Sequence, residues 1–75
     1  MKLLSTCQIG EKLKVVRLTA DSVLKQRLIS FGIMKEAIIE VLEHAPRKST
    51  IEVKVGKMRV ALRGKEADMV EVEEI

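Results

Sequence analysis

The residues of this chain that could bind a metal ion are few and far apart. It contains one cysteine, Cys7, and one histidine, His44, which are 37 positions apart. A metal site needs several converging donor atoms, and short spacings between Cys and His residues usually mark one. We therefore expect no metal ligands and no cofactor. Cys7 is predicted to be a small semi-buried apolar residue and His44 a strand-end residue with a solvated ring.

Residues for covalent or acid–base catalysis are also missing from the sequence. It has no nucleophile paired with a base, no paired carboxylates that suggest a pocket and no glycine-rich phosphate loop. We expect no catalytic residues, and we predict that the chain is a binding protein and not an enzyme.

The basic residues are unevenly distributed. The whole chain carries a net charge of +3. Residues 65–75 hold five acids and one base, so residues 1–64, with 13 bases and 6 acids, carry +7. Such a body could meet an acidic protein face, anionic lipid or nucleic acid, or its lysines could simply keep strand edges soluble.

A small basic nucleic-acid-binding barrel is the alternative function that this charge leaves open. Lys54, Lys57 and Arg59 would then contact phosphates, and binding would fall steeply with salt. Barrels of this kind usually stack bases on aromatic side chains, and Phe31 is the only aromatic residue here. We therefore expect no nucleic-acid partner.

The best candidate for a partner-binding surface is the end of a predicted helix. Leu24, Leu28 and Phe31 recur at the spacing of one helical face and predict a helix over 21–31, with Gly32 in the left-handed conformation at its end. Thr19, Asp21 or Ser22 could cap its start, and Phe31 is expected to fill the mouth of a barrel.

Four residues at this helix end form the predicted partner-binding set: Arg27, Ile33, Met34 and Lys35. Arg27 could bind a partner, or it could donate to carbonyls at the helix end, where a positive charge is favoured. Ile33 and Met34 are consecutive, so we expect one of them to be exposed beside the basic Lys35.

The rest of the chain reads as short strands. Residues 11–18 alternate and then slip at Val15-Val16, which predicts a bulge or bend. Residues 37–43 form a strand that ends before Pro46. Residues 50–55 and 58–63 form a hairpin around Gly56-Lys57, with Met58, Val60 and Leu62 facing inward. Residues 64–69 form a helical turn, and residues 70–73 form the last strand.

This order predicts a mainly β fold: a small, strongly bent five-stranded barrel with one inserted helix and a short C-terminal helical turn. Residues 1–75 form one domain with an aliphatic core, and exposed strand edges would allow a dimer. The single cysteine and the short apolar run at Leu3-Leu4 favour the cytoplasm over a secreted or membrane-spanning protein.

Three blocks carry a family resemblance. One contains Arg27, Leu28, Phe31, Gly32 and Ile33, one is Ala45-Pro46, and one contains Ala61, Leu62, Arg63, Glu66 and Ala67. With the stretch from Gly10 to Leu18 and with Gly56, they resemble the FeoA family of small ferrous iron transport accessory proteins, over about residues 9–72.

The resemblance implies an SH3-like barrel with a helix inserted after the first strand. It implies a cytoplasmic accessory of ferrous iron uptake that contacts the membrane ferrous iron transporter and its cytosolic GTP-binding domain. It implies no enzymatic activity. The family also carries a label of transition metal ion binding, for which Cys7 and His44 supply no ligand set.

Two turns depart from the family pattern. Many members have Pro-Gly where this chain has Lys35-Glu36, and many have Gly-Asp-Pro where it has Arg47-Lys48-Ser49-Thr50. Neither the positive φ of glycine nor the fixed φ of proline is available at these positions, so we expect the backbone of both turns to differ.

Overall fold

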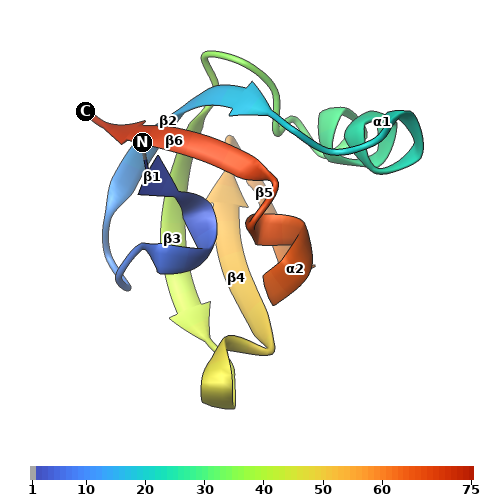
Figure 1. Cartoon of the computed structure of the whole chain (residues 1–75). Helices are drawn as coiled ribbons and strands as arrows, with labels where there is room; N and C mark the ends of the chain where they lie inside the picture. The colour runs from blue at the N-terminus through green and yellow to red at the C-terminus, as the bar shows by residue number, and fades with distance from the viewer. Residues whose placement is uncertain (1) are drawn as a thin grey trace.

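The computed structural model describes residues 2–75, and Met1, the first residue of the predicted domain, lies outside them. Within this range one antiparallel sheet has the spatial order β1-β6-β2-β3-β4-β5 (Figure 1). The strands are β1 (Lys2–Leu3), β2 (Lys12–Leu18), β3 (Ile38–His44), β4 (Thr50–Val55), β5 (Met58–Arg63) and β6 (Val70–Glu74). The helices are α1 (Ser22–Ser30) and α2 (Gly64–Ala67), and short 3-10 turns cover Leu4–Thr6 and Pro46–Lys48.

The five predicted strands, the inserted helix and the short C-terminal helix are confirmed. The structure adds β1, a strand of two residues that pairs with β6. The sheet is strongly bent, and it is irregular where β2 shifts register between Val15 and Arg17, as the slip at Val15-Val16 predicted. A second irregularity lies between Val41 and Glu43 in β3. Bulges of this kind raise local twist, which helps a small sheet curl around its core.

The core is aliphatic, as predicted. Alternate residues of the central strands point inward and are buried: Leu13, Val15, Ile39, Val41, Ile51, Val53, Val60 and Leu62. Leu28 from α1 and Val70 and Val72 from β6 belong to the same cluster, as do Leu4, Cys7, Ile33, Val55 and Ala67. Phe31 is half-buried and packs against the cluster, which fits its predicted place at the mouth of the barrel.

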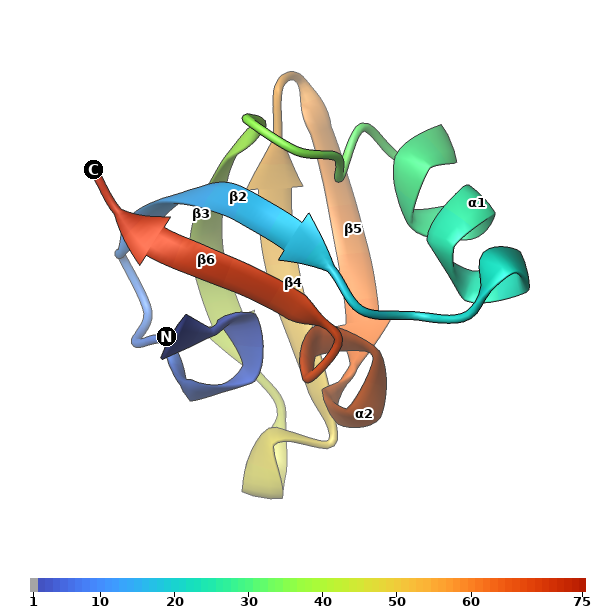
Figure 2. The ribbon, with the colours of Figure 1, turned by 45° about the horizontal axis from the view of Figure 1, so that its top comes forward.

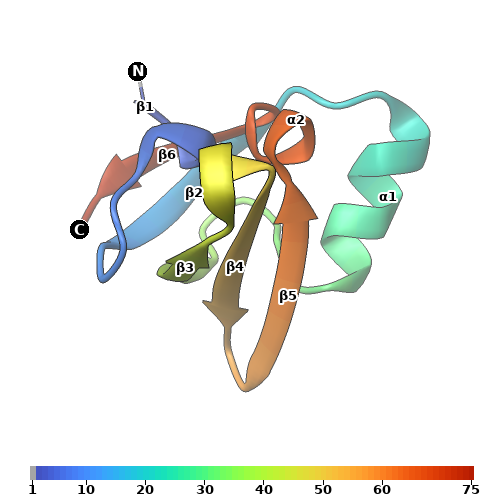
Figure 3. The same ribbon diagram turned by 90° about the horizontal axis from the view of Figure 1, so that it is seen from below.

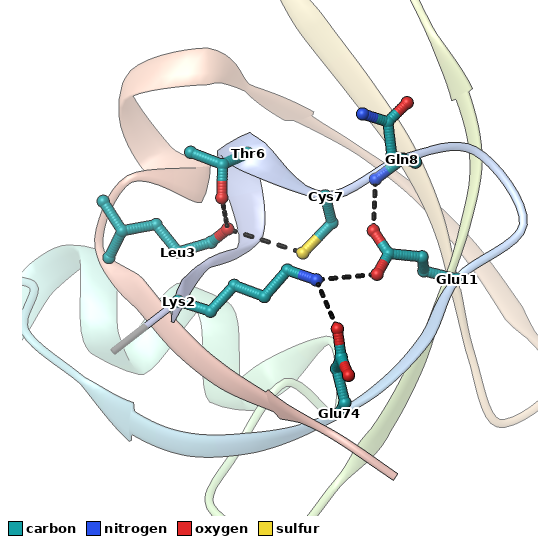
Figure 4. Close-up of polar contacts among 7 residues, drawn as sticks. All are labelled: Lys2, Leu3, Thr6, Cys7, Gln8, Glu11 and Glu74. Carbon is teal, nitrogen blue, oxygen red and sulfur yellow. Dashed lines mark hydrogen bonds and ion pairs between the residues drawn. The ribbon is translucent and has the colours of Figure 1, made fainter.

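The N-terminal segment is held by a polar cluster (Figure 4). Lys2 Nζ lies 2.7 Å from Glu11 Oε1 and 3.2 Å from Glu74 Oε1. The hydrogen bond to Glu11 and the nearby Glu74 carboxylate raise the pKa of Lys2. The pKa of Glu11 is lowered, first because the Gln8 backbone N–H donates to its carboxylate and second because Lys2 does. One lysine thus connects β1 to the segment before β2 and to the end of β6.

Helix α1 lies beside the sheet, next to β5 (Figures 2 and 3). Its first turn is capped by Asp21, whose carboxylate accepts the Leu24 N–H at 2.9 Å. Strand β5 pairs only with β4, so it is one edge of the sheet. Across residues 2–75, none of the helices has the length and apolar character needed to cross a bilayer.

Candidate functional site: a groove at the end of helix α1

A groove opens where α1 ends beside the β4–β5 turn. Its apolar lining comes from two regions that are distant in sequence: residues 29–38, from the helix end to the start of β3, and residues 55–58 at the β4–β5 turn. We call it the helix-end groove and define it by Ile29, Phe31, Met34, Ile38, Val55 and Met58. In Figure 2 the end of α1, the loop into β3 and the top of β5 lie around the same end of the barrel.

Large apolar side chains are exposed around this groove. Ile29 is 40% exposed, Met34 43%, Ile38 47% and Met58 49%. The largest apolar patch of a small domain is often an interaction site, which makes this surface a candidate. Met34 belongs to the predicted partner-binding set, whereas Ile29, Ile38 and Met58 were missed by sequence reasoning.

The prediction that Met58 faces the core needs correction. Met58 pairs with Val55 across the hairpin, so both side chains lie on the same face of the sheet. Val55 is buried, but Met58 belongs to the last pair before the turn, at the open end of the barrel, and half of it is exposed. The alternation of apolar and polar residues correctly places Met58 in β5 on the inward face. Its exposure could not be predicted from this alternation, because it depends on where the barrel ends.

The end of α1 decides which of Ile33 and Met34 is exposed. Gly32 has a φ of +91°, its N–H donates to the Ile29 carbonyl at 2.9 Å, and the Ile33 N–H donates to the Leu28 carbonyl at 2.9 Å. This is the Schellman pattern, in which the residue after the glycine packs back on the helix. Ile33 is accordingly 0% exposed. It supports the groove from inside the core and is no longer a candidate contact residue.

Gly32 cannot be replaced without cost. A Cβ atom at this position would lie 3.3 Å from Val55 Cγ1, and a φ of +91° is already unfavourable for residues with a side chain. The predicted left-handed glycine is therefore confirmed, and it also brings the chain close to β4.

The loop between α1 and β3 is a tight turn that presents Met34 and Lys35. The Ala37 N–H donates to the Met34 carbonyl at 2.9 Å, with Lys35 and Glu36 between them. Glu36 has a φ of +79° and Lys35 does not have a positive φ, which is the pattern of a type II turn. Such turns prefer proline and then glycine at these two positions.

The expected loss of the positive φ at the two departing turns is therefore wrong. Glu36 has a φ of +79° and Arg47 a φ of +60°, so both residues adopt a conformation that suits glycine. The surrounding hydrogen bonds over-determine the first turn, since the Glu36 N–H also donates to the Val15 carbonyl at 2.8 Å.

Arg27 connects the first and third sequence blocks. Its Nη1 lies 2.9 Å from Glu66 Oε2, and its guanidinium lies 5.7 Å from the centre of the Phe31 ring. The other oxygen of Glu66 accepts the Arg63 N–H at 2.8 Å, at the start of α2. The sequence allows two roles for Arg27. The structure shows a long-range ion pair with Glu66 in place of the predicted local bond to carbonyls at the helix end, and partner binding stays a prediction.

Glu66 was quoted in a motif, but sequence reasoning gave it no role at the helix end. Its side chain is 10% exposed and that of Arg27 is 56% exposed. The pair joins residues 39 positions apart, and Phe31, which lines the groove, lies against the same guanidinium. Glu66 is therefore linked to the groove by two successive contacts, first with Arg27 and then from Arg27 to Phe31.

One lysine lines the groove and three others lie close to it in the chain or in an adjoining pocket. Lys57 lines it directly, and Lys35 lies in the turn between Met34 and Ala37. An adjoining shallow pocket, which shares Ile38 with the groove, is bordered by Lys12 and Lys54. Within residues 2–75 these four lysines form no ion pair.

Cys7 and His44 belong to no cluster of potential metal ligands among the described residues. Over the described range, no three His, Cys, Asp or Glu side chains are grouped so that they could hold a metal ion. Cys7 is fully buried, more than predicted, and its Sγ lies 3.4 Å from the Leu3 carbonyl oxygen. His44 ends β3 as predicted, but its ring is not fully solvated, because Nε2 is buried without a hydrogen-bond partner.

Fold and groove together define a small SH3-like β domain with an exposed apolar groove. Residues 2–74 match the FeoA domain family, and the chain therefore belongs to that family. A Campylobacter jejuni protein named as an Fe(2+) transport protein A is 36% identical over 63 residues, which cover 84% of this chain and 85% of that protein.

Solved structures of FeoA proteins have the same fold. The crystal structure of an iron uptake regulatory protein, FeoA, is 32% identical, with a TM-score of 0.90 over 99% of this chain and 97% of that one. FeoA of Stenotrophomonas maltophilia, described as a prokaryotic SH3 domain protein and solved in complex with zinc, is 26% identical, with a TM-score of 0.85. That match covers 97% of this chain and 91% of the other.

Proposed function

We propose that this protein is a cytoplasmic accessory of ferrous iron uptake. It acts by binding the membrane ferrous iron transporter at its cytosolic GTP-binding domain. Membership of the FeoA family and the name of the Campylobacter jejuni relative support the link to ferrous iron transport. The groove supports a binding role in place of a catalytic one.

The observation that carries the contact surface is the exposure of Met34 beside unpaired lysines. Met34 is 43% exposed, Lys35 follows it in the same turn, and Lys57 lines the same groove. Burial of one methionine side chain in an interface is worth about 1.5–3 kcal/mol. Arg27 stands at the side of this surface, where its ion pair with Glu66 leaves half of its side chain exposed.

The test is binding of the purified chain to the GTP-binding domain of its host's ferrous iron transporter at near-physiological salt. We expect saturable binding that Met34→Asp weakens at least tenfold, because a carboxylate cannot be buried there without about 1.4 kcal/mol or more of loss. Ile9→Asp is the matched control, since Ile9 is an exposed apolar residue outside the groove. Equal weakening by both variants would reject the surface.

A random DNA duplex in the same assay tests the alternative function. Arg59, one of the three residues proposed for phosphate contact, is already paired with Glu52 at 2.6 Å, and Phe31 is half-buried beside Arg27. Neither observation favours a nucleic-acid partner. DNA binding tighter than binding to the transporter domain would overturn the proposed function.

Association of two copies through an exposed strand edge stays a prediction. Strand β5 offers such an edge, beside α1 (Figure 3). Sedimentation at several protein concentrations would detect it.

A further inference from the structure

We propose that the helix-end groove binds an apolar segment of a partner protein that carries carboxylates beside its apolar side chains. This inference rests on the proposed function only for the partner being a protein. The chemistry of the segment follows from the groove.

The lining explains the apolar part of the ligand. Met34 and Met58 reach into the groove from separate segments, and Phe31 lies between the helix end and the core. Methionine side chains are unbranched and polarisable, so they adapt to partner side chains of different shapes. The groove therefore suits a few aliphatic or aromatic side chains in succession, without selecting strictly among them.

The charged border explains the carboxylates. Several other bases of the described chain are already paired: Lys2, Lys14, Arg17, Arg27 and Arg59 each lie within 3.2 Å of a glutamate oxygen. The bordering bases Lys12, Lys35, Lys54 and Lys57 have no such partner. Unpaired lysines around an apolar surface favour a partner with negative charge at the same spacing.

Among the described residues, two acids, Glu36 and Glu40, lie near these four lysines in the chain or in the sheet, and neither forms an ion pair with them. Glu40 lies opposite both Lys12 and Lys54 in the sheet, but it forms no ion pair with either. Glu36 is in the turn after Lys35 and is exposed. The border therefore keeps an excess of two positive charges.

A second copy of this chain is a poor occupant. The chain's acidic segment is β6 with its flanks, and there Glu71, Glu73 and Glu74 are already paired with Arg17, Lys14 and Lys2. An anionic bilayer would also meet lysines beside exposed apolar side chains, and the vesicle measurement below separates it from a protein segment.

Methionine-methyl NMR of the full chain with two small amphiphiles tests the proposal. Octanoate carries an apolar tail and a carboxylate, and octyltrimethylammonium carries the same tail with a positive head. We expect octanoate to shift the Met34 and Met58 methyl signals saturably, and to bind at least threefold tighter than the cation. Met69 is an internal control, because it is exposed but lies outside the groove, with its sulfur 3.6 Å from Thr19 Oγ1.

Two variants sharpen the measurement. Lys57→Glu should weaken octanoate binding at least threefold, because Lys57 borders the groove. Lys65→Glu, which makes the same change at an exposed lysine outside the groove, should leave it unchanged. Thermal unfolding of both variants checks that the fold is kept.

The outcomes are separable from those of the transporter assay, because no transporter is used here. Equal affinity for both amphiphiles, or equal shifts at Met69, would overturn the inference and leave the proposed function standing.

A separate measurement uses vesicles that contain phosphatidylglycerol. Co-sedimentation with them at physiological salt, lost in Lys57→Glu, would assign the surface to lipid and overturn the protein segment.

Discussion

Glu36 shows how a single residue can keep a turn that its side chain does not favour. Its φ of +79° costs a residue with a Cβ atom roughly 1–2 kcal/mol relative to glycine. The turn persists because its backbone hydrogen bonds to Met34 and Val15 are made whatever the side chain. The residue type here departs from the family pattern, and Glu36 nevertheless adopts a φ that suits glycine.

Glu36→Gly is therefore expected to stabilise the protein. Glycine relieves the strain but adds freedom to the unfolded chain, so the net gain is about 0.5–1 kcal/mol. For a domain of this size that gain raises Tm by roughly 2–8 °C. Calorimetry of the variant and its parent measures the shift.

Glu36→Ala is the matched control, because it removes the same charge but keeps the Cβ atom. It should leave Tm unchanged or lower it slightly. A similar rise in both variants would mean that the glutamate charge, and not the backbone conformation, limits stability.

At the scale of elements, α1 is attached to the barrel by two kinds of contact. Leu28 enters the core, and Arg27 reaches Glu66 at the start of α2. Glu66 is shared, since one oxygen pairs with Arg27 and the other accepts the Arg63 N–H. The inserted helix and the C-terminal helical turn therefore depend on the same carboxylate.

Two substitutions of Glu66 should separate these roles. Glu66→Ala removes both contacts and should cost roughly 2 kcal/mol in the free energy of unfolding. Glu66→Gln keeps an oxygen that can accept the Arg63 N–H and loses only the charge. It should cost about 0.5–1 kcal/mol, since the guanidinium is partly exposed. Urea unfolding measures both values.

Glu52→Ala serves as the reference, because it breaks the pair with Arg59 on the outside of the sheet without touching a helix. It should cost about 0.5 kcal/mol or less. If Glu66→Gln proved as damaging as Glu66→Ala, the ion pair would dominate and the bond to Arg63 would contribute little.

The helices and strands were largely predictable, because each depends on a residue pattern within its own segment of the sequence. Alternation of apolar and polar residues gives the hairpin of β4 and β5, and helical spacing with Gly32 gives α1 and its end. Strand β1 was not predicted, because a strand of two residues is too short to show an alternation of apolar and polar residues. The Arg27–Glu66 pair was missed because no local pattern links positions 39 apart.

The site was less predictable than the fold. Met34 and Lys35 were chosen from their place after the helix, and both are exposed. Ile38 and Met58 reach the same groove only because the sheet bends and the hairpin turn ends beside α1. Such convergence depends on tertiary structure, which neither composition nor periodicity describes.

At the scale of the whole molecule, the contacts that hold β1 at the edge of the sheet contribute to stability in a pH-dependent way. Lys2 lies between Glu11 and Glu74 and joins three segments from the two ends of the chain. The pKa of Glu11 is lowered below its ordinary 4.5, so its contribution to stability is present above that pH. It is lost as the pH falls through the lowered value. The raised pKa of Lys2 acts in the opposite direction: its contribution is complete below 10.5 and is lost at higher pH.

Glu11→Gln should therefore flatten the acid side of the stability profile. The variant should be less stable than its parent near neutral pH, and the difference should shrink as the pH falls well below 4.5. Urea unfolding at a series of pH values from 7 to about 3 measures the two curves.

Glu36→Gln is the control for that series, because Glu36 is exposed and forms no ion pair in the part of the chain described here. Its curve should run parallel to that of the parent. A constant gap between Glu11→Gln and the parent at every pH would contradict the linkage.

The two methionines of the groove also make it open to chemical damage. Peroxide converts an exposed thioether to a sulfoxide, which is polar and no longer suits an apolar contact. Met34 and Met58 are both accessible, and both stand where an apolar partner would dock. Mild oxidation should therefore abolish groove binding while the buried aliphatic core, to which residues 2–75 contribute no methionine, keeps its fold. Mass spectrometry of the oxidised residues, compared with binding and Tm of the same sample, would show whether this accessory is switched off by oxidants.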